Sequence, residues 1–524
     1  MKIIIDCQKT IGPLRPIWRS FGYDEINWTY TPRGKRIFNE ISKLSPEPYY
    51  IRCHNTFTSG NGLSTVSSGS CNVYSENGQG EPVFDFSILD QVIETILLNN
   101  CKPVVELGFM PDALSKAPKP KPTYNYDRTN LWVYPPKDYP KWQNLVFQTV
   151  KHFVEKYGEK EVETWYWELW NEPDYSGFFK GSVNNYCRLY DYSVAGATSA
   201  LPAIRIGGPG LAANPAFLVK FLTHCSRGKN VVTGKRGTRL DFISFHAKGN
   251  GWPLKGQPFE MPSLATIFSF LEKYNQVLEK FPHYKNIDCL FDECDMAVAT
   301  NFGMYDFSEL EFNNTSYYPV FLVRMVKHLL DFIEQKKMPI KFFTTWAFYF
   351  EGKRFFEGNR ALFTNENIKK PVFNAFTLLE MLGDKRISFE VQNIPDSTKF
   401  PITDGLATQS SPNSFEVVLW NFDEKQENDN EATYQLNFNN LISISKSASI
   451  RRYQIDLLHS NSYFVWKEMG SPQDPSPQQL ETLRHSQNLE MIEKEDNIQI
   501  NDGELRYRLT LPECSVCLLQ IEVS

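Results

Sequence analysis

The sequence has no apolar run approaching the roughly 20 residues that a membrane helix needs. It also lacks a basic excess, because 55 Lys and Arg stand against 61 Asp and Glu, a formal charge of −6. Nucleic-acid binders normally carry a positive surplus, so we expect no nucleic-acid partner and no membrane. The opening MKIIIDCQ ends its apolar run at Asp6, too early for a signal peptide. Localisation stays open: cytoplasmic, or periplasmic or secreted with a leader removed.

Patterns typical of metal sites are also missing. The 10 Cys are scattered, and Cys514 and Cys517 form a C-x-x-C with no second pair at zinc-site spacing. Only 8 His occur, and none stands in an H-x-H or H-E-x-x-H pattern. We therefore expect ordinary thiols in a reducing compartment, no metal and no other cofactor.

The sequence is long and rich in aromatic residues. A chain of 524 residues is too long for one compact domain and predicts two or three units. Aromatics make up 14%, which suits a large core and a ligand cleft lined with flat rings. The pattern changes near residue 385, so we predict an N-terminal strand in 1–16, a barrel in 17–385 and a β-sandwich in 386–524.

The first part alternates short apolar segments with amphipathic helices, for example 87–99 and 142–157. Each apolar segment ends in polar, charged or Gly residues. Eight alternations predict an α/β fold, a TIM (β/α)8 barrel, with a doubly wound open sheet as the alternative. The predicted strands are 18–24, 49–57, 103–109, 165–173, 204–210, 242–249, 289–295 and 342–348.

Two further stretches depart from this alternation of strands and helices. Residues 112–140 are rich in Pro, Tyr and Lys, which predicts a long loop on the active face or a disordered insert. From 386 onward apolar and polar residues alternate, as in half-buried strands, and helices nearly vanish. This predicts an accessory antiparallel β-sandwich, which the strand at 3–6 would join.

Acidic residues stand at the ends of two predicted barrel strands. Side chains at the carboxyl ends of such strands share one cleft, so Glu172 and Glu293 should face one another. Glycoside cleavage needs such a pair, one acid to protonate the leaving oxygen and one carboxylate to attack or to activate water. Glu172 lies in an aromatic run (165–170), and apolar surroundings raise a carboxyl pKa and suit the acid role. Glu293 would stay ionised as the nucleophile.

These segments carry a family resemblance. WNEPD (170–174) and FDECD (291–295) resemble the acid/base and nucleophile segments of clan A retaining glycosidases. Most of the stretch 14–380 resembles glycoside hydrolase family 39, which groups β-xylosidases with α-L-iduronidases. Further matching segments are LRPIWRSFGYDE, IRCH, IRIGGPG, RLDFISFHAKG and KKPVFNAFTLLEMLG. The resemblance implies a barrel with an accessory β-sandwich, Glu172 as general acid/base and Glu293 as nucleophile.

The resemblance also implies substrate-binding residues. Asn171 would hydrogen-bond the sugar 2-OH, and His54 and His246 would contact other sugar hydroxyls. Trp346, at the end of the eighth strand, would support the sugar's apolar face. The alternatives are that these histidines are satisfied core residues and that Trp346 is plain core packing.

Lys248 and one arginine bear on the kind of sugar. In iduronidases a lysine in the matching H-x-K-G segment binds the uronate carboxylate, and an arginine in the strand-eight loop joins it. Lys248 matches that lysine, and Arg354 or Arg360 would take the arginine's place. Otherwise Lys248 pairs with a neighbouring acid or lies at the rim.

The sequence therefore predicts a retaining glycoside hydrolase of the xylan 1,4-β-xylosidase type, acting on terminal residues of an oligosaccharide or glycoside. The alternatives are an α-L-iduronidase-like enzyme or another exo-glycosidase. A carbohydrate-binding protein on a dead barrel would have lost a catalytic Glu, and both are present. The oligomeric state stays open.

Overall fold

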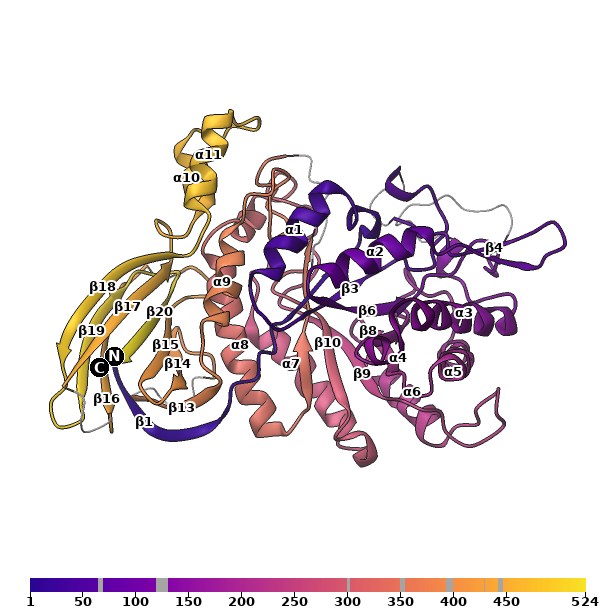
Figure 1. Ribbon diagram of the computed structural model, residues 1–524, viewed down its shortest axis with the longest axis horizontal. Helices are drawn as coiled ribbons and strands as arrows, with labels where there is room; N and C mark the ends of the chain where they lie inside the picture. Colours follow the sequence, from indigo (N-terminus) through magenta and orange to yellow (C-terminus); the bar gives the residue numbers. More distant parts are fainter. Residues whose placement is uncertain are drawn as a thin grey trace.

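The computed structural model describes residues 1–64, 69–118, 131–298, 302–348, 354–392, 399–427, 429–441 and 446–524. Figure 1 shows a helix-covered barrel beside a strongly curved second sheet, with both chain termini at that sheet. Within the described ranges, no helix combines the length and the apolar character that a membrane crossing requires.

The barrel consists of parallel strands in the order β11-β10-β9-β8-β7-β6-β3-β2-β12. Its two edge strands are halves of one segment, separated only by Thr344, and they pair with β10 and β2. The eighth strand therefore closes the sheet, and the predicted TIM barrel is confirmed. The strands are β2 Ser20–Tyr23, β3 Tyr49–Cys53, β6 Cys101–Leu107, β7 Tyr166–Leu169, β8 Ile206–Leu211, β9 Phe242–Lys248, β10 Asp288–Asp295, β11 Ile340–Phe343 and β12 Thr345–Phe348.

Amphipathic helices cover the outside of the barrel. Helix α3 shows the local cause: Asp138 caps its first turn by accepting from Lys141 N, and Gly158, at φ 85°, ends it. The helices are α1 Pro32–Ser42, α2 Ser87–Leu98, α3 Tyr139–Tyr157, α4 Glu159–Val162, α5 Val183–Ala200, α6 Pro215–Arg227, α7 Leu264–Leu278, α8 Tyr317–Lys336 and α9 Pro371–Glu380. Short 3-10 helices span Ile26–Trp28, Gly62–Ser64, Leu131–Val133, Pro282–Tyr284 and Ser308–Asn313, and a small hairpin joins β4 Tyr74–Glu76 to β5 Pro82–Phe84.

The predicted loop at 112–140 is only partly described, because residues 119–130 lie outside the described ranges. Its two flanks meet, since Ser115 forms an isolated bridge with Pro136. Trp132 is buried with its ring 4.4 Å from that of Phe109. The second flank thus packs onto the barrel beside the end of β6.

The second sheet has the order β18-β17-β20-β15-β14-β13-β1-β16-β19. It is mixed, because the N-terminal strand runs antiparallel to β13 but parallel to β16. The sheet curls over: Arg452 of β17 donates to the carbonyl of Thr510 in β19 at 2.9 Å. The accessory β-unit is therefore confirmed, with one parallel pairing. Its strands are β1 Lys2–Pro13, β13 Lys385–Gln392, β14 Thr403–Ser411, β15 Ser414–Asn421, β16 Ala432–Asn439, β17 Ser447–Ile455, β18 Glu490–Gln499, β19 Leu505–Leu511 and β20 Ser515–Val523.

One expectation for the second part was wrong, because two helices interrupt it between β17 and β18. They are α10 Ser462–Glu468 and α11 Pro477–Ser486. The polar stretch that indicated a loop contains a capping box, in which Ser476 and Gln479 bond each other's backbone. Trp466 and Leu483 of this hairpin are buried against Phe355 and Phe356 of the barrel.

Candidate active site

The carboxyl ends of five barrel strands bring the predicted site residues together. Glu293 lies within β10, His246 and Lys248 within β9, and Trp346 within β12. Asn171 and Glu172 follow β7, and His54 follows β3. Because parallel strands of a barrel end on one rim, residues far apart in sequence share a single cleft.

The two predicted catalytic acids lie close together. An oxygen of Glu172, a ring nitrogen of His246 and an oxygen of Glu293 all lie within 4.8 Å of one another. Retaining glycosidases hold their carboxyl groups about 5–5.5 Å apart, and inverting ones about 6.5–9.5 Å to admit a water. The separation therefore fits direct attack by one of the two acids.

Glu172 owes its position to an unusual backbone. Its φ is 45° and that of Trp170 is 67°, a left-handed conformation that non-glycine residues rarely adopt. The N–H of Glu172 donates to the carbonyl of Gly210 at 2.8 Å, which ties the turn after β7 to β8. Such strain clusters at functional sites, where the surrounding structure maintains it.

Glu293 is a buried carboxylate held by cations. Lys248 Nζ donates to Oε2 at 2.8 Å, and Arg52 Nη1 donates to Oε1 at 3.2 Å. Burial alone would raise the pKa of Glu293, but Lys248, His246 and Arg52 together hold it well below its usual range. Glu293 is therefore ionised, as a nucleophile must be.

Glu172 is the more accessible acid, with 17% of its side chain exposed, and its Oε1 lies 3.0 Å from His246 Nδ1. The aromatic run before it does not surround the carboxyl group as the sequence argument assumed. Trp165 and Trp167 point outward onto Phe153 of α3, because alternate side chains of a strand face opposite ways. The carboxyl group of Glu172 contacts a histidine rather than a set of apolar side chains.

The predicted sugar-binding residues lie around Glu293. His54 Nε2 is 3.6 Å from Glu293 Oε1, and its Nδ1 is 2.6 Å from Glu106 Oε2. Asn171 Oδ1 accepts from Arg52 Nη2 at 2.9 Å. The Trp346 ring lies 4.5 Å from that of His54, and its Nε1 donates to Asp24 Oδ2 at 2.9 Å. These residues form one wall of the cleft, and their roles remain predictions.

Lys248 is shared between two acids, and only one of the two candidate arginines joins it. Its Nζ donates to Asp295 Oδ2 at 2.6 Å as well as to Glu293. Arg360 is buried and also donates to Asp295 Oδ2. Arg354 lies elsewhere: it pairs with Glu357 at 2.8 Å, stacks over Tyr305 and is 37% exposed. The assignment of Arg354 to the site therefore has no support in its contacts.

Several charged residues beneath the cleft were not predicted. Arg52, Glu106, Glu168 and Asp292 are fully buried inside the barrel. Each lies within an apolar strand, as in VVELGF and WYWELW, and a charge in such a segment is the signal that could have revealed them. Buried charges are rare unless they are paired.

The trio Glu172, His246 and Glu293 is also the group of described residues with donor atoms close enough to hold a metal ion. Two cations, Arg52 and Lys248, already contact the oxygens of Glu293. The donor set is thus neutralised by protein side chains, which suits acid–base chemistry better than metal binding.

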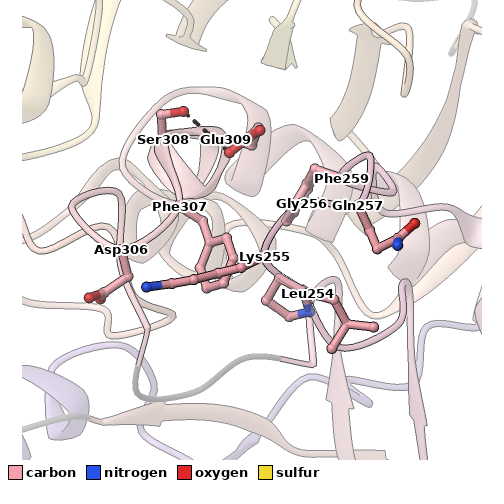
Figure 2. A pocket seen from close by; sticks show the side chains of 10 residues that line it. Leu254, Lys255, Gly256, Gln257, Phe259, Asp306, Phe307, Ser308 and Glu309 are labelled. Carbon is pink, nitrogen blue, oxygen red and sulfur yellow. Dashed lines mark hydrogen bonds between the residues drawn. The ribbon is translucent and has the colours of Figure 1, made fainter.

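A groove lies between the segments that follow β9 and β10. Its volume is about 320 Å³, at the small end of the roughly 300–1,000 Å³ of ligand pockets. Figure 2 shows Lys255 reaching across it, past the ring of Phe307, toward Asp306. Because both segments leave the carboxyl ends of strands, the groove opens on the same side of the barrel as the two acids.

Paired acids across the carboxyl end of a (β/α)8 barrel define the molecule as a glycoside hydrolase. The chain belongs to the glycosyl hydrolases family 39, whose family model matches residues 1–499. The predicted family is therefore confirmed, and a glycoside is the substrate class.

Relatives within the family differ in activity. A β-xylosidase of Geobacillus stearothermophilus is 29% identical over 483 residues, covering 88% of this chain and 85% of the relative. An α-L-iduronidase of Mus musculus is 26% identical over 311 residues, covering 56% of this chain and 43% of the relative. Among solved structures, a bacterial orthologue of human α-L-iduronidase superimposes with a TM-score of 0.80 at 20% identity, covering 100% of this chain and 84% of that one. The structural similarity shows the fold.

Proposed function

We propose that this protein is a retaining β-D-xylosidase that removes terminal glycosyl residues by double displacement. Glu293 is the nucleophile and Glu172 is the general acid/base. The observation that carries the proposal is the ionised, doubly held carboxylate of Glu293 with Glu172 at most 4.8 Å away.

In the first step Glu172 protonates the leaving oxygen while Glu293 attacks the anomeric carbon, forming a covalent glycosyl-enzyme. In the second step Glu172 removes a proton from water, which displaces Glu293 and restores both groups. Lys248 and Arg52 keep Glu293 deprotonated, so the attacking oxygen is available at the start of each cycle.

Binding of the sugar would use the wall beside Glu293. Asn171 would contact the 2-OH, an interaction that strengthens in the transition state, and its amide NH₂ remains able to donate while its oxygen accepts from Arg52. His54 and His246 would contact other hydroxyls, and Trp346 would lie against the sugar's apolar face.

Two observations favour a neutral sugar over a uronate. Lys248 and Arg360 both contact Asp295, and Lys248 contacts Glu293 as well, so both cations already have carboxylate partners. A substrate carboxylate would have to compete with them. The match to the β-xylosidase also extends over 88% of the chain, against 56% for the mouse iduronidase. An iduronidase-like activity is the second candidate, since Lys248 stands where such a lysine is expected.

The test is hydrolysis of a panel of aryl glycosides: β-D-xyloside, α-L-arabinoside, β-D-galactoside and α-L-iduronide. We expect the highest kcat/KM on β-xyloside, with proton NMR showing the β-anomer of xylose as the first product. Preference for the iduronide would refute the xylosidase assignment, and the α-anomer as first product would refute retention.

A further inference from the structure

Beneath the two catalytic acids lies a buried group with more acids than cations. Glu106, Glu168 and Asp292 each have no exposed surface, and they come from β6, β7 and β10. Arg52, equally buried, contacts all three. One guanidinium cannot neutralise three carboxylates, and uncompensated buried charge is costly, so protons on the acids or on the adjoining histidines must supply the difference.

Glu106 and Glu168 differ in the partners that balance their negative charge. Glu106 Oε2 is 2.6 Å from His54 Nδ1 and 3.3 Å from Arg52 Nη2, so it has a histidine as well as the arginine as a partner. Glu168 Oε2 accepts from Arg52 Nε at 2.6 Å. Its other oxygen, Oε1, is buried and accepts no hydrogen bond of normal geometry among the described residues, although the Ser244 hydroxyl is near enough to oppose the rise in the pKa of Glu168.

Asp292 is likewise a buried acid whose oxygens lack hydrogen bonds to the described residues. Its Oδ2 is 3.5 Å from Arg52 Nε and its Oδ1 is 3.6 Å from His246 Nε2, and neither has a hydrogen bond within the described part of the chain. Glu168 and Asp292 both contact Arg52 Nε, Glu168 Oε2 at 2.6 Å and Asp292 Oδ2 at 3.5 Å, and each carboxyl group lies within hydrogen-bonding reach of the other once one of them carries a proton. Two adjacent carboxyl groups without a donor between them are satisfied together when they share one proton.

The surrounding charges indicate which of the two carboxyl groups, Glu168 or Asp292, carries the shared proton. Burial and the charge of Asp292 raise the pKa of Glu168 well above its usual range, against the opposing effects of Arg52 and of the Ser244 hydroxyl. Burial also acts to raise the pKa of Asp292, but His246 and Arg52 outweigh it and lower the value to about 2. Tyr186 also faces this pair, with its hydroxyl donating to the carbonyl of Leu169 at 2.8 Å.

We propose that Glu168 is a neutral acid that donates its proton to Asp292, so that Asp292 stays ionised and holds His246 as an imidazolium against Glu172. Glu168 and Asp292 are positioning residues, since they act through His246. The assignment rests on the proposed acid/base role of Glu172. The shared proton is not consumed in the cycle, because only Glu172 exchanges protons with the leaving oxygen and with water.

A charged His246 would act in the first step of the reaction. When Glu172 gives its proton away it becomes a carboxylate, and His246 Nδ1, 3.0 Å from its Oε1, can donate to that new charge. Three carboxyl groups face His246: Glu172 from the turn after β7, and Asp292 and Glu293 from β10. Despite burial, which acts in the opposite direction, Glu293 and Asp292 raise the pKa of His246 to about 10.

A matched pair of variants tests which residue carries the proton. Glu168→Gln keeps one donor for Asp292 and one acceptor for Arg52, as a neutral acid does, so kcat/KM should stay within about threefold of wild type and the pH profile should not move. Asp292→Asn removes the negative charge opposite His246. Its kcat/KM should fall more than about tenfold, and the His246 ring, followed by its ¹⁵N signals, should lose its proton at lower pH, because the negative charge that held that proton is gone.

The opposite pattern, with Asp292→Asn tolerated and Glu168→Gln inactive, would overturn the proposal. Equal tolerance of both, or equal loss in both folded variants, would overturn it too, since a purely structural role predicts equal effects and no pH shift. Circular dichroism and thermal melting establish folding, and an unfolded Glu168→Gln counts against the proposal because the amide should be accepted.

A measurement on the wild type is independent of those variants. With ¹⁵N-labelled histidine, the His246 ring, assigned by its loss in His246→Gln, should give an imidazolium signal at pH 8, and a neutral ring at that pH would overturn the proposal. Failure of the wider catalytic assignment has a separate signature. It would show as a Glu293→Ala variant that azide cannot rescue, whatever Glu168→Gln and Asp292→Asn do.

Discussion

At the scale of single residues, the proposed mechanism needs one carboxylate that stays charged and a second acid that exchanges a proton. Glu293 is buried between Lys248 and Arg52, whereas Glu172 is more exposed and lies beside His246. Two acids of the same type thus differ in environment, and a difference in environment is what separates acid from nucleophile in glycosidases.

Replacing the nucleophile should give a rescuable enzyme. Glu293→Ala is expected to lower kcat by at least about 10³-fold on aryl β-xyloside, because no covalent intermediate can form. Azide should fill the vacated space, attack the open anomeric face and yield a glycosyl azide of inverted configuration, detected by NMR. Glu357→Ala, which removes an acid from the Arg354 pair, is the control and should need no azide. An azide product of retained configuration would contradict the role of Glu293.

Replacing the acid should depend on the leaving group. Glu172→Ala removes proton donation, which contributes about 10²–10⁴-fold, so unactivated xylo-oligosaccharides should lose that much kcat/KM. Aryl xylosides with acidic phenols need little protonation and should lose far less. A plot of rate against leaving-group pKa measures the difference, and an equal loss across the series would contradict the assignment.

Lys248 should control the acid limb of the pH profile. Lys248 is the foremost of the cations that hold the pKa of Glu293 well below its usual range. Lys248→Met should therefore raise that pKa. Activity, which needs the carboxylate, is lost as pH falls through the pKa, so the acid limb of kcat/KM should move to higher pH. Lys280→Met, at an exposed position after α7, is the matched control and should leave the limb in place.

The same variant reports on the sugar. On β-xyloside near neutral pH, Lys248→Met should change kcat/KM only modestly. A uronide would lose a charge-assisted contact of about 1.5–3 kcal/mol. A folded variant without activity on β-xyloside at any pH would mean that Lys248 holds a hydroxyl of the neutral sugar.

At the scale of elements, the hairpin α10–α11 connects the second sheet to the rim of the barrel. Gln473 accepts from the N–H of Phe355 at 3.1 Å and donates to the Tyr305 hydroxyl at 2.8 Å. The same barrel segment continues to Arg360, which pairs with Asp295, the second partner of Lys248. The hairpin therefore supports the segment on which the cleft's buried ion pairs depend.

Removing the main apolar contact of the hairpin should loosen it. Trp466 is buried with its ring 5.1 Å from that of Phe356, and Trp466→Ala in such a site costs about 3–5 kcal/mol. Hydrogen exchange should become faster in 462–486 and in 354–360, and Tm should fall. Glu468→Ala, at an exposed position in the same helix, is the control. Unchanged exchange in 354–360 would show that the hairpin does not support that segment.

At the scale of the whole molecule, the barrel and the second sheet share one core. Trp420, Phe422 and Leu518 of the second unit belong to the same buried cluster as the α8 residues Tyr317 and Phe321. The first strand of the chain also lies in that sheet, between β13 and β16. We propose that the chain divides into residues 1–16, 17–385 and 386–524. These three units pack together around a shared core.

A chain cut at the domain boundary should not fold alone. Residues 1–385 would expose the apolar face of α8 that now lies on the second sheet, and exposed apolar patches favour aggregation. We expect insoluble protein, while the full chain unfolds in one cooperative transition by calorimetry. A soluble 1–385 fragment with wild-type kcat/KM would show instead that the second unit is dispensable.

Much of the fold could be read from the sequence, because it depends on local alternation. The apolar segments marked all eight barrel strands, and Gly158 marked the end of α3. The hairpin α10–α11 was missed because its apolar residues pack on a distant segment, Phe355 and Phe356, rather than on a neighbour in sequence.

What the sequence determined by itself is the barrel, the family and the positions of Glu172 and Glu293 at strand ends, since the alternation of apolar segments and the order of the short motifs are both written along the chain. Only the tertiary structure decided their environments. It placed Arg360 rather than Arg354 beside Lys248, turned Trp165 and Trp167 away from Glu172, and gathered Arg52, Glu168 and Asp292 beneath the cleft. Charges and burial act through space, so the ionisation of a site depends on which strands close the barrel around it.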